Sequence, residues 1–124
     1  KQAARFNRTI RVLLQIYIAR EDTKFGLSFV ECIELLESGL IADCKYVEVC
    51  GLMGMATNTD NETQICEEFA KLNTFFKTVK ASYFSNQDSF REISMGMSHD
   101  YKLAIAEGST MIRVGSSIFG ERSY

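Results

Sequence analysis

The chain has 124 residues, a formal net charge of -2, 46% hydrophobic residues and 24% charged residues. This apolar fraction excludes an intrinsically disordered chain, and the lack of any run of about 18 apolar residues excludes a membrane-spanning helix. The slightly acidic balance argues against non-specific nucleic-acid binding, which would need a basic stripe.

The four cysteines and the single histidine do not have the spacing of a metal site. Cys32, Cys44, Cys50 and Cys66 include no pair separated by two residues, and His99 is distant from all of them. We therefore expect no metal, and reduced thiols that pack as small apolar groups in a cytoplasmic protein.

Apolar runs and helix-capping motifs alternate along the first half of the chain. Residues 10–18 form a β-branched run that is typical of a strand buried on both faces, and 46–55 form a second apolar run. Between them, Ser28-x-x-Glu31 is a capping box that predicts a helix start, and Gly39 has the position of a helix-terminating glycine.

The longest predicted helix follows the second strand. Thr59 and Glu62 form a second capping box at its start. Behind this box, apolar residues recur at alternating intervals of four and three residues, which predicts one continuous buried stripe. The stripe consists of Ile65, Phe69, Leu72, Phe76, Val79 and Tyr83.

The predicted elements in the last third of the chain are shorter. We expect a strand at 92–96, a helix from Ser98 to Gly108, a strand at 110–114 and a final turn at 118–120. Strict alternation of this kind predicts an α/β fold with about four parallel strands joined by right-handed crossovers. Four such units make either a small open sheet or half of an eight-stranded barrel.

Ligands of parallel α/β folds bind where the strands end at the carboxyl edge of the sheet. Two of these ends combine glycine and serine with an expected helix start: Ser94, Gly96 and Ser98 in one, Gly115 and Ser116 in the next. Such segments offer backbone N–H groups to an anion and predict a phosphate cradle. The plainer interpretation is that these serines only cap helices.

Two basic residues near the strand ends are also candidates. Arg113 lies inside the expected strand 110–114, where a buried guanidinium needs a partner. This partner is either a carboxylate in a structural ion pair or an acceptor on a ligand. Lys24, in the loop after the first strand, is either an anion contact or an exposed lysine without a role.

Several motifs at the strand ends form a recognisable set. They are Gln15–Gly26 with Glu21 and Lys24, Gly51-Leu52-Met53, Ser94-Met95-Gly96-Met97-Ser98-His99-Asp100, and the closing run Arg113-Val114-Gly115-Ser116-Ser117-Ile118-Phe119-Gly120. Together they resemble the signature of the pyridoxal-phosphate homeostasis proteins, which are similar to the barrel domain of alanine racemase. The resemblance covers essentially the whole chain.

The resemblance implies a (β/α)8 TIM barrel that holds pyridoxal 5′-phosphate (PLP). Residues 1–124 would form the second, C-terminal half of this single domain, with the N-terminal half absent, because a full barrel has roughly 200–250 residues. The start at Lys1, without Met, agrees with this expectation of a fragment. The family's Schiff-base lysine lies at the end of the first strand, so we expect no catalytic residue here.

The resemblance also implies cofactor contacts. The two glycine–serine loops would hold the phosphate, and Arg113 would face the pyridine nitrogen. A guanidinium there keeps the ring nitrogen unprotonated and gives little support to carbanion chemistry. Lys24 and Met53 are further candidates for the pocket. The expected cofactor-binding residues are Ser94, Met95, Gly96, Ser98, Arg113, Gly115 and Ser116.

The function favoured by this resemblance is PLP binding and homeostasis without robust catalysis. The alternatives are a PLP-dependent racemase of the alanine type, which would need a second acid/base residue, and a generic phosphate-binding α/β domain. We expect no nucleic-acid or membrane partner, a monomer at full length, and weak or absent PLP binding by this half alone. An isolated half-barrel would expose two strand edges, so we expect it to self-associate.

Overall fold

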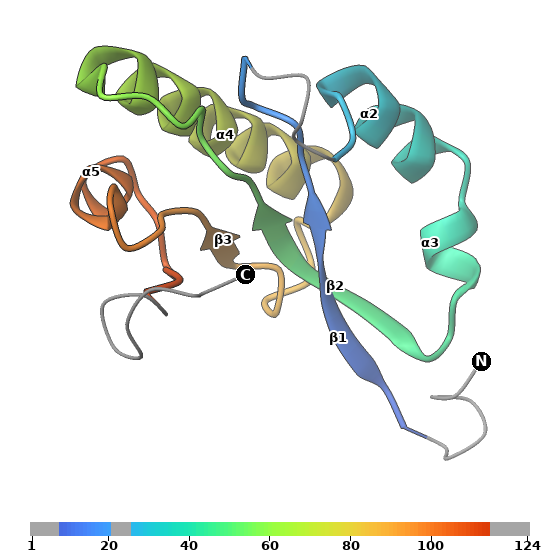
Figure 1. Cartoon of the computed structure of the whole chain (residues 1–124). Helices are drawn as coiled ribbons and strands as arrows, with labels where there is room; N and C mark the ends of the chain where they lie inside the picture. Colours follow the sequence, from blue (N-terminus) through green and yellow to red (C-terminus); the bar gives the residue numbers. More distant parts are fainter. Residues whose placement is uncertain (1–7, 21–25, 115–124) are drawn as a thin grey trace, which may run out of the picture.

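The computed structural model of the chain describes residues 8–20 and 26–114. Its centre is a sheet of three parallel strands, β1 (Ile10–Gln15), β2 (Val47–Met53) and β3 (Glu92–Ser94), which lie side by side in chain order (Figure 1). The predicted parallel α/β arrangement is therefore confirmed for these three strands.

Helices occupy the connections between the strands, as the alternation predicted. The first crossover contains α2 (Phe29–Glu37) and a short α3 (Leu40–Asp43), and the second contains α4 (Glu62–Tyr83). The last helix, α5 (Tyr101–Ala106), follows β3. Among these helices, only α3 was not predicted from the sequence.

The predicted start and end of α2 are both confirmed. The Ser28 Oγ accepts a hydrogen bond from the Glu31 backbone N at 3.0 Å, and the Glu31 carboxylate accepts one from the Ser28 backbone N at 2.9 Å. Gly39 ends the helix with a φ of 78°, a left-handed conformation that favours glycine.

The predicted capping box of α4 is wrong, although the helix itself is present. Asn61 takes the cap position, and its side-chain oxygen accepts from the Gln64 backbone N at 3.2 Å. The Thr59 hydroxyl instead accepts from the Asn61 backbone N at 3.2 Å, so it stabilises the turn before the helix. Thr59 and Asn61 are both suitable cap residues, and the spacing alone did not distinguish them.

One hydrophobic core lies between the sheet and the helices. The predicted stripe of α4 faces it: four of its six members are buried, and Phe76 and Tyr83 pack against them with partial exposure. Strand residues that point toward the helices complete the core. The buried members from these elements are Ile65, Phe69, Leu72 and Val79 from α4, with Val49, Leu52 and Ile93 from the strands.

The expected strand 110–114 is wrong as a regular strand. Within the described residues it forms a single parallel bridge, between Ser94 and Met111. The segment nevertheless lies beside β3, because the Arg113 backbone N donates to the Gly96 carbonyl at 3.0 Å. Residues 110–113 therefore lie next to β3, as the predicted order of strands requires, but they do not form a regular hydrogen-bond ladder with it.

Side-chain hydroxyls explain why this ladder is interrupted. The backbone N–H groups of Thr110 and Met111 both donate to the Ile93 carbonyl, so two residues oppose one. The Thr110 hydroxyl accepts from the Ile93 backbone N at 2.9 Å, and the Ser109 hydroxyl lies 2.8 Å from the Met95 and Met111 carbonyls. These hydroxyls replace part of the regular strand pairing.

The helix expected from Ser98 to Gly108 is also shorter than predicted. It spans only Tyr101–Ala106, and Ser98 lies in the preceding turn rather than at the cap. The argument that this serine marks a helix N-terminus therefore loses its basis. The predictions for Lys24, for Gly115 and Ser116, and for the final turn at 118–120 lie outside the described residues.

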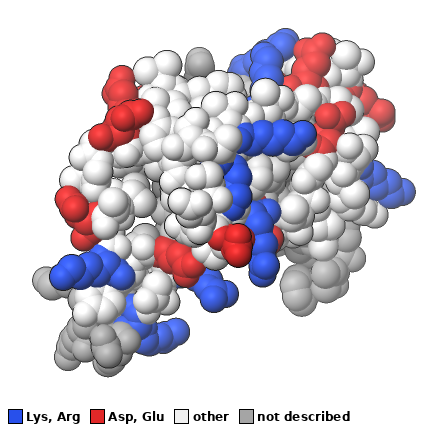
Figure 2. All heavy atoms as spheres, turned by 180° about the vertical axis from the view of Figure 1, so that it is seen from behind, with Lys and Arg blue, Asp and Glu red and all other residues white. Residues whose placement is uncertain are grey.

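The surface charge concerns the predicted absence of a nucleic-acid partner, and the character of the helices concerns the predicted absence of a membrane partner. Acidic and basic side chains are interspersed on the face seen from behind, rather than forming a patch of one sign (Figure 2). Within the described residues, none of the helices combines the length and the apolar character that a bilayer crossing requires.

Candidate functional site

The carboxyl ends of β2 and β3 bring three of the predicted site residues together. Met53 and Ser94 are direct partners across the two strands, and the Gly54 backbone N donates to the Ser94 carbonyl at 3.0 Å. The Arg113 guanidinium reaches the same place, where its Nη2 donates to the Gly54 carbonyl at 3.3 Å. This edge is the one at which parallel α/β folds bind ligands.

Arg113 has an unsatisfied donor at this edge. Its Nε is buried and has no hydrogen-bond partner among the described residues, and no carboxylate among them lies within ion-pair distance of the guanidinium. Burial lowers the pKa of Arg113, and the more distant Asp100 raises it. A buried unpaired donor costs about 1–3 kcal/mol, so an acceptor at this position would stabilise the protein.

Asp100 is a buried acidic residue in the turn before α5. Its side chain is almost fully buried, and one carboxylate oxygen accepts from the Met97 backbone N at 2.7 Å. The other oxygen lies 3.4 Å from the His99 Nε2. The carboxylate therefore holds the loop after β3 in shape and adds negative charge on the side of Arg113.

Three more predicted site residues, Met95, Gly96 and Ser98, lie in the loop after β3 at the carboxyl edge of the sheet. Packing alone explains why methionine and glycine occupy the first two positions. Met95 is fully buried, and Gly96 has a φ of 105°. A Cβ at Gly96 would lie 2.7 Å from the Ala104 Cβ of α5, so the fold itself requires glycine there. Ser98 is partly buried in the turn before α5. Their role as a phosphate cradle stays a prediction, since Gly115 and Ser116 lie outside the described residues.

The sequence reasoning missed a buried carboxylate beneath the loop that follows β2. Glu68 of α4 is 1% exposed and accepts two hydrogen bonds from Thr57. A signal was present in the sequence: Glu68 comes three residues after Ile65 and therefore lies on the apolar stripe of the helix. A carboxylate on that face needs a specific partner.

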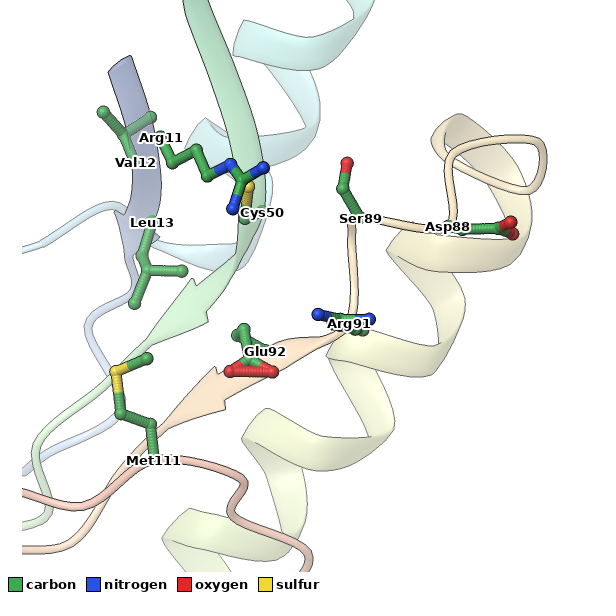
Figure 3. A pocket seen from close by; sticks show the side chains of 9 residues that line it. All are labelled: Arg11, Val12, Leu13, Cys50, Asp88, Ser89, Arg91, Glu92 and Met111. Carbon is green, nitrogen blue, oxygen red and sulfur yellow. The ribbon is translucent and has the colours of Figure 1, made fainter. Parts of the chain in front are cut away.

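A pocket lies on the sheet near the start of the strands, away from these residues. It has a volume of about 650 Å³, and the stick view shows strand and loop side chains around it (Figure 3). None of the predicted site residues lines it. The lining residues are Arg11, Val12, Leu13, Cys50, Asp88, Ser89, Arg91, Glu92 and Met111.

The four cysteines are unpaired thiols. Cys32 and Cys50 are buried, Cys66 is partly buried and Cys44 is exposed. Burial raises the pKa of Cys32 to about 11, so this thiol stays protonated at neutral pH. Within the described residues, His, Cys, Asp and Glu side chains form no group of three or more that could hold a metal ion.

Comparison with known proteins identifies the family to which the chain belongs. Residues 1–123 match the family described as alanine racemase, N-terminal domain. The match covers nearly the whole chain, and the chain belongs to this family.

Two curated relatives show which proteins the chain is similar to. The chain is 39% identical over 116 residues to the pyridoxal phosphate homeostasis protein of Vibrio alginolyticus, covering 93% of this chain and 47% of the relative. It is 34% identical over 124 residues to the protein of the same name from Aquifex aeolicus, covering 100% and 52%. The chain thus spans about half the length of the curated relatives it matches.

A solved structure shows the same fold. PipY of Synechococcus elongatus PCC7942, with PLP bound, superposes with a TM-score of 0.79 at 29% sequence identity. The match covers 95% of this chain and 52% of the PipY chain. The three parallel strands and their helices therefore correspond to about half of that protein.

Proposed function

We propose that this chain binds PLP at the carboxyl edge of its sheet and that its protein serves PLP homeostasis. The observation that carries the proposal is the buried Nε of Arg113, which lacks a partner among the described residues next to the ends of β2 and β3. The pyridine nitrogen of PLP is an acceptor of the kind this donor needs. The PLP-bound PipY relative and the names of the curated relatives support the same cofactor.

In this proposal, Arg113 donates a hydrogen bond to the ring nitrogen, and the loops at Ser94–Ser98 and at Gly115–Ser116 hold the phosphate. PLP supplies an electron-withdrawing ring when bound. A guanidinium at the ring nitrogen keeps that nitrogen unprotonated and weakens the electron withdrawal. Such an arrangement suits a protein that holds the cofactor better than one that stabilises carbanions.

We further propose that this chain is the second half of a (β/α)8 barrel. Three β/α units in chain order, followed by a segment that lies beside β3, support this proposal, as does the match to about half of PipY. In this arrangement the lysine that attaches PLP belongs to the first half. A cytoplasmic location and a monomeric full-length protein remain predictions.

The proposal is tested by titrating the whole protein that carries this sequence with PLP. We expect saturable binding, and we expect Arg113→Met to weaken it at least 10-fold, because a charge-assisted hydrogen bond contributes about 1.5–3 kcal/mol. Arg91→Met is the matched control, since Arg91 is exposed and lies at the opposite end of β3. Equal affinity of the Arg113→Met and wild-type proteins would contradict the assignment.

A second assay separates homeostasis from racemisation. The same protein, loaded with PLP, is incubated with L-alanine, and the D-enantiomer is measured by chiral chromatography. We expect no racemisation above the rate of free PLP. Clear turnover would overturn the homeostasis function and favour the racemase alternative.

A further inference from the structure

Glu68 is a buried acidic residue on an otherwise apolar helix face. It is 1% exposed, and burying a charged group is costly unless the group is paired. Its two oxygens accept from the Thr57 backbone N at 2.6 Å and from the Thr57 hydroxyl at 2.7 Å. The Gln64 side-chain amide donates a third bond at 3.1 Å. The short distances are typical of bonds to an ionised carboxylate.

The Thr57 hydroxyl extends this network to the neighbouring strand. It accepts from the Arg20 backbone N at 2.7 Å while it donates to Glu68. The carboxylate therefore ties the segment after β2 to the segment after β1 and fixes both on α4. The Arg20 guanidinium does not take part, because it pairs with Glu67 on the surface at 3.5 Å.

The same segment provides the hydrogen-bond acceptor for Arg113. Gly54, whose carbonyl accepts from the Arg113 guanidinium at 3.3 Å, is three residues before Thr57. The segment is held at one end by its pairing with Ser94 and at the other by Glu68. Both anchors therefore act on the short segment that carries the Gly54 carbonyl.

We propose that Glu68 is a positioning residue of the cofactor site. Its carboxylate fixes residues 54–57, and this segment orients Arg113 toward the ring nitrogen of PLP. A preorganised donor binds its acceptor without a further ordering cost, which is the advantage that a rigid supporting residue provides. This inference rests on the proposed PLP-binding function.

The test compares Glu68→Gln with Glu67→Gln in the whole protein that carries this sequence. Both variants remove one negative charge from adjacent residues, but only Glu68 is buried. We expect Glu68→Gln to raise the Kd for PLP about 10-fold and to shift the absorbance maximum of the bound cofactor. We expect Glu67→Gln to leave both unchanged.

A double-mutant cycle distinguishes positioning from general support of the fold. If Glu68 acts through Arg113, Glu68→Gln changes the Kd for PLP less than twofold in an Arg113→Met background. Thr57→Val, which removes the hydroxyl and keeps the shape, should reproduce the loss of affinity if Glu68→Gln fails to fold.

Each outcome decides the inference. Additive effects, an unchanged Kd in folded Glu68→Gln, or failure of both variants to fold would make Glu68 a structural residue only. Wild-type protein that does not bind PLP would overturn the proposed function itself, so the two failures are distinguishable.

Discussion

Two buried polar groups at the carboxyl edge of the sheet differ in how completely they are satisfied. Glu68 accepts three hydrogen bonds at 2.6–3.1 Å, whereas the Nε of Arg113 donates none to the described residues. A satisfied buried group stabilises the folded chain, and an unsatisfied one lowers stability unless a ligand completes it. The comparison distinguishes a buried group whose partners all lie within the chain from one that has no partner among the described residues.

The largest loss of stability is expected when the fully hydrogen-bonded carboxylate of Glu68 is removed. Glu68→Ala leaves the Thr57 donors without an acceptor and should lower the free energy of unfolding by about 3 kcal/mol. Urea unfolding followed by circular dichroism measures this loss. Glu67→Ala is the control and should cost less than about 0.5 kcal/mol, because its ion pair is exposed. Equal losses in the two variants would contradict the buried network.

Alkaline pH tests the packing around the buried thiol of Cys32. The pKa of Cys32 rises from an ordinary 9.0 to about 11 in the folded chain. Between these values the unfolded state binds fewer protons, so stability is full below pH 9 and falls by about 2–3 kcal/mol as the pH rises to 11. Urea midpoints across this range measure the slope, which Cys32→Ala should flatten. An unchanged slope in that variant would assign the effect to other groups.

A smaller effect is expected at the loop between β3 and α5. Gly96→Ala combines a left-handed φ of 105° with a Cβ contact of 2.7 Å to Ala104, and it should lower stability by about 2 kcal/mol. Gly39→Ala is the matched control: its φ is 78°, and a Cβ there would meet no atom within 4 Å apart from its chain neighbours, so only about 1 kcal/mol is expected. Thermal unfolding compares the two. A larger loss at Gly39 would show that the packing against α5 is not the determining factor.

The smallest change in stability is expected when the unpaired Nε of Arg113 is removed. In the absence of PLP, Arg113→Met should change the free energy of unfolding by less than about 1 kcal/mol. The lost bond to the Gly54 carbonyl is offset by removal of a buried unpaired N–H. Urea unfolding of the PLP-free protein measures this. A loss as large as that of Glu68→Ala would show that Arg113 is a structural residue.

Much of the fold follows from patterns in the sequence. The strands, the capping box at Ser28 and the apolar stripe of α4 were predicted because each depends on local spacing. The regular strand at 110–114 was predicted wrongly, because its ladder is interrupted by the hydroxyls of Ser109 and Thr110. Such long-range side-chain bonds have no periodic signature in the sequence.

The candidate site was predictable only in part. Arg113 stood out because a charge inside an apolar run needs a partner, and the structure places it beside Gly54. The missing partner of its Nε is a three-dimensional property that spacing does not reveal. Glu68 was overlooked because the apolar residues around it dominated the pattern, although its position on the helix face was computable.

The order of the strands has a consequence for how the chain reaches this structure. Each strand pairs with the one that precedes it in the chain, and residues 110–113 then settle against β3. Every new unit emerging from the ribosome therefore finds its neighbour already made. The sheet can therefore grow in the direction of synthesis, whereas the bond between Arg113 and the Gly54 carbonyl forms only when the last described residues are present.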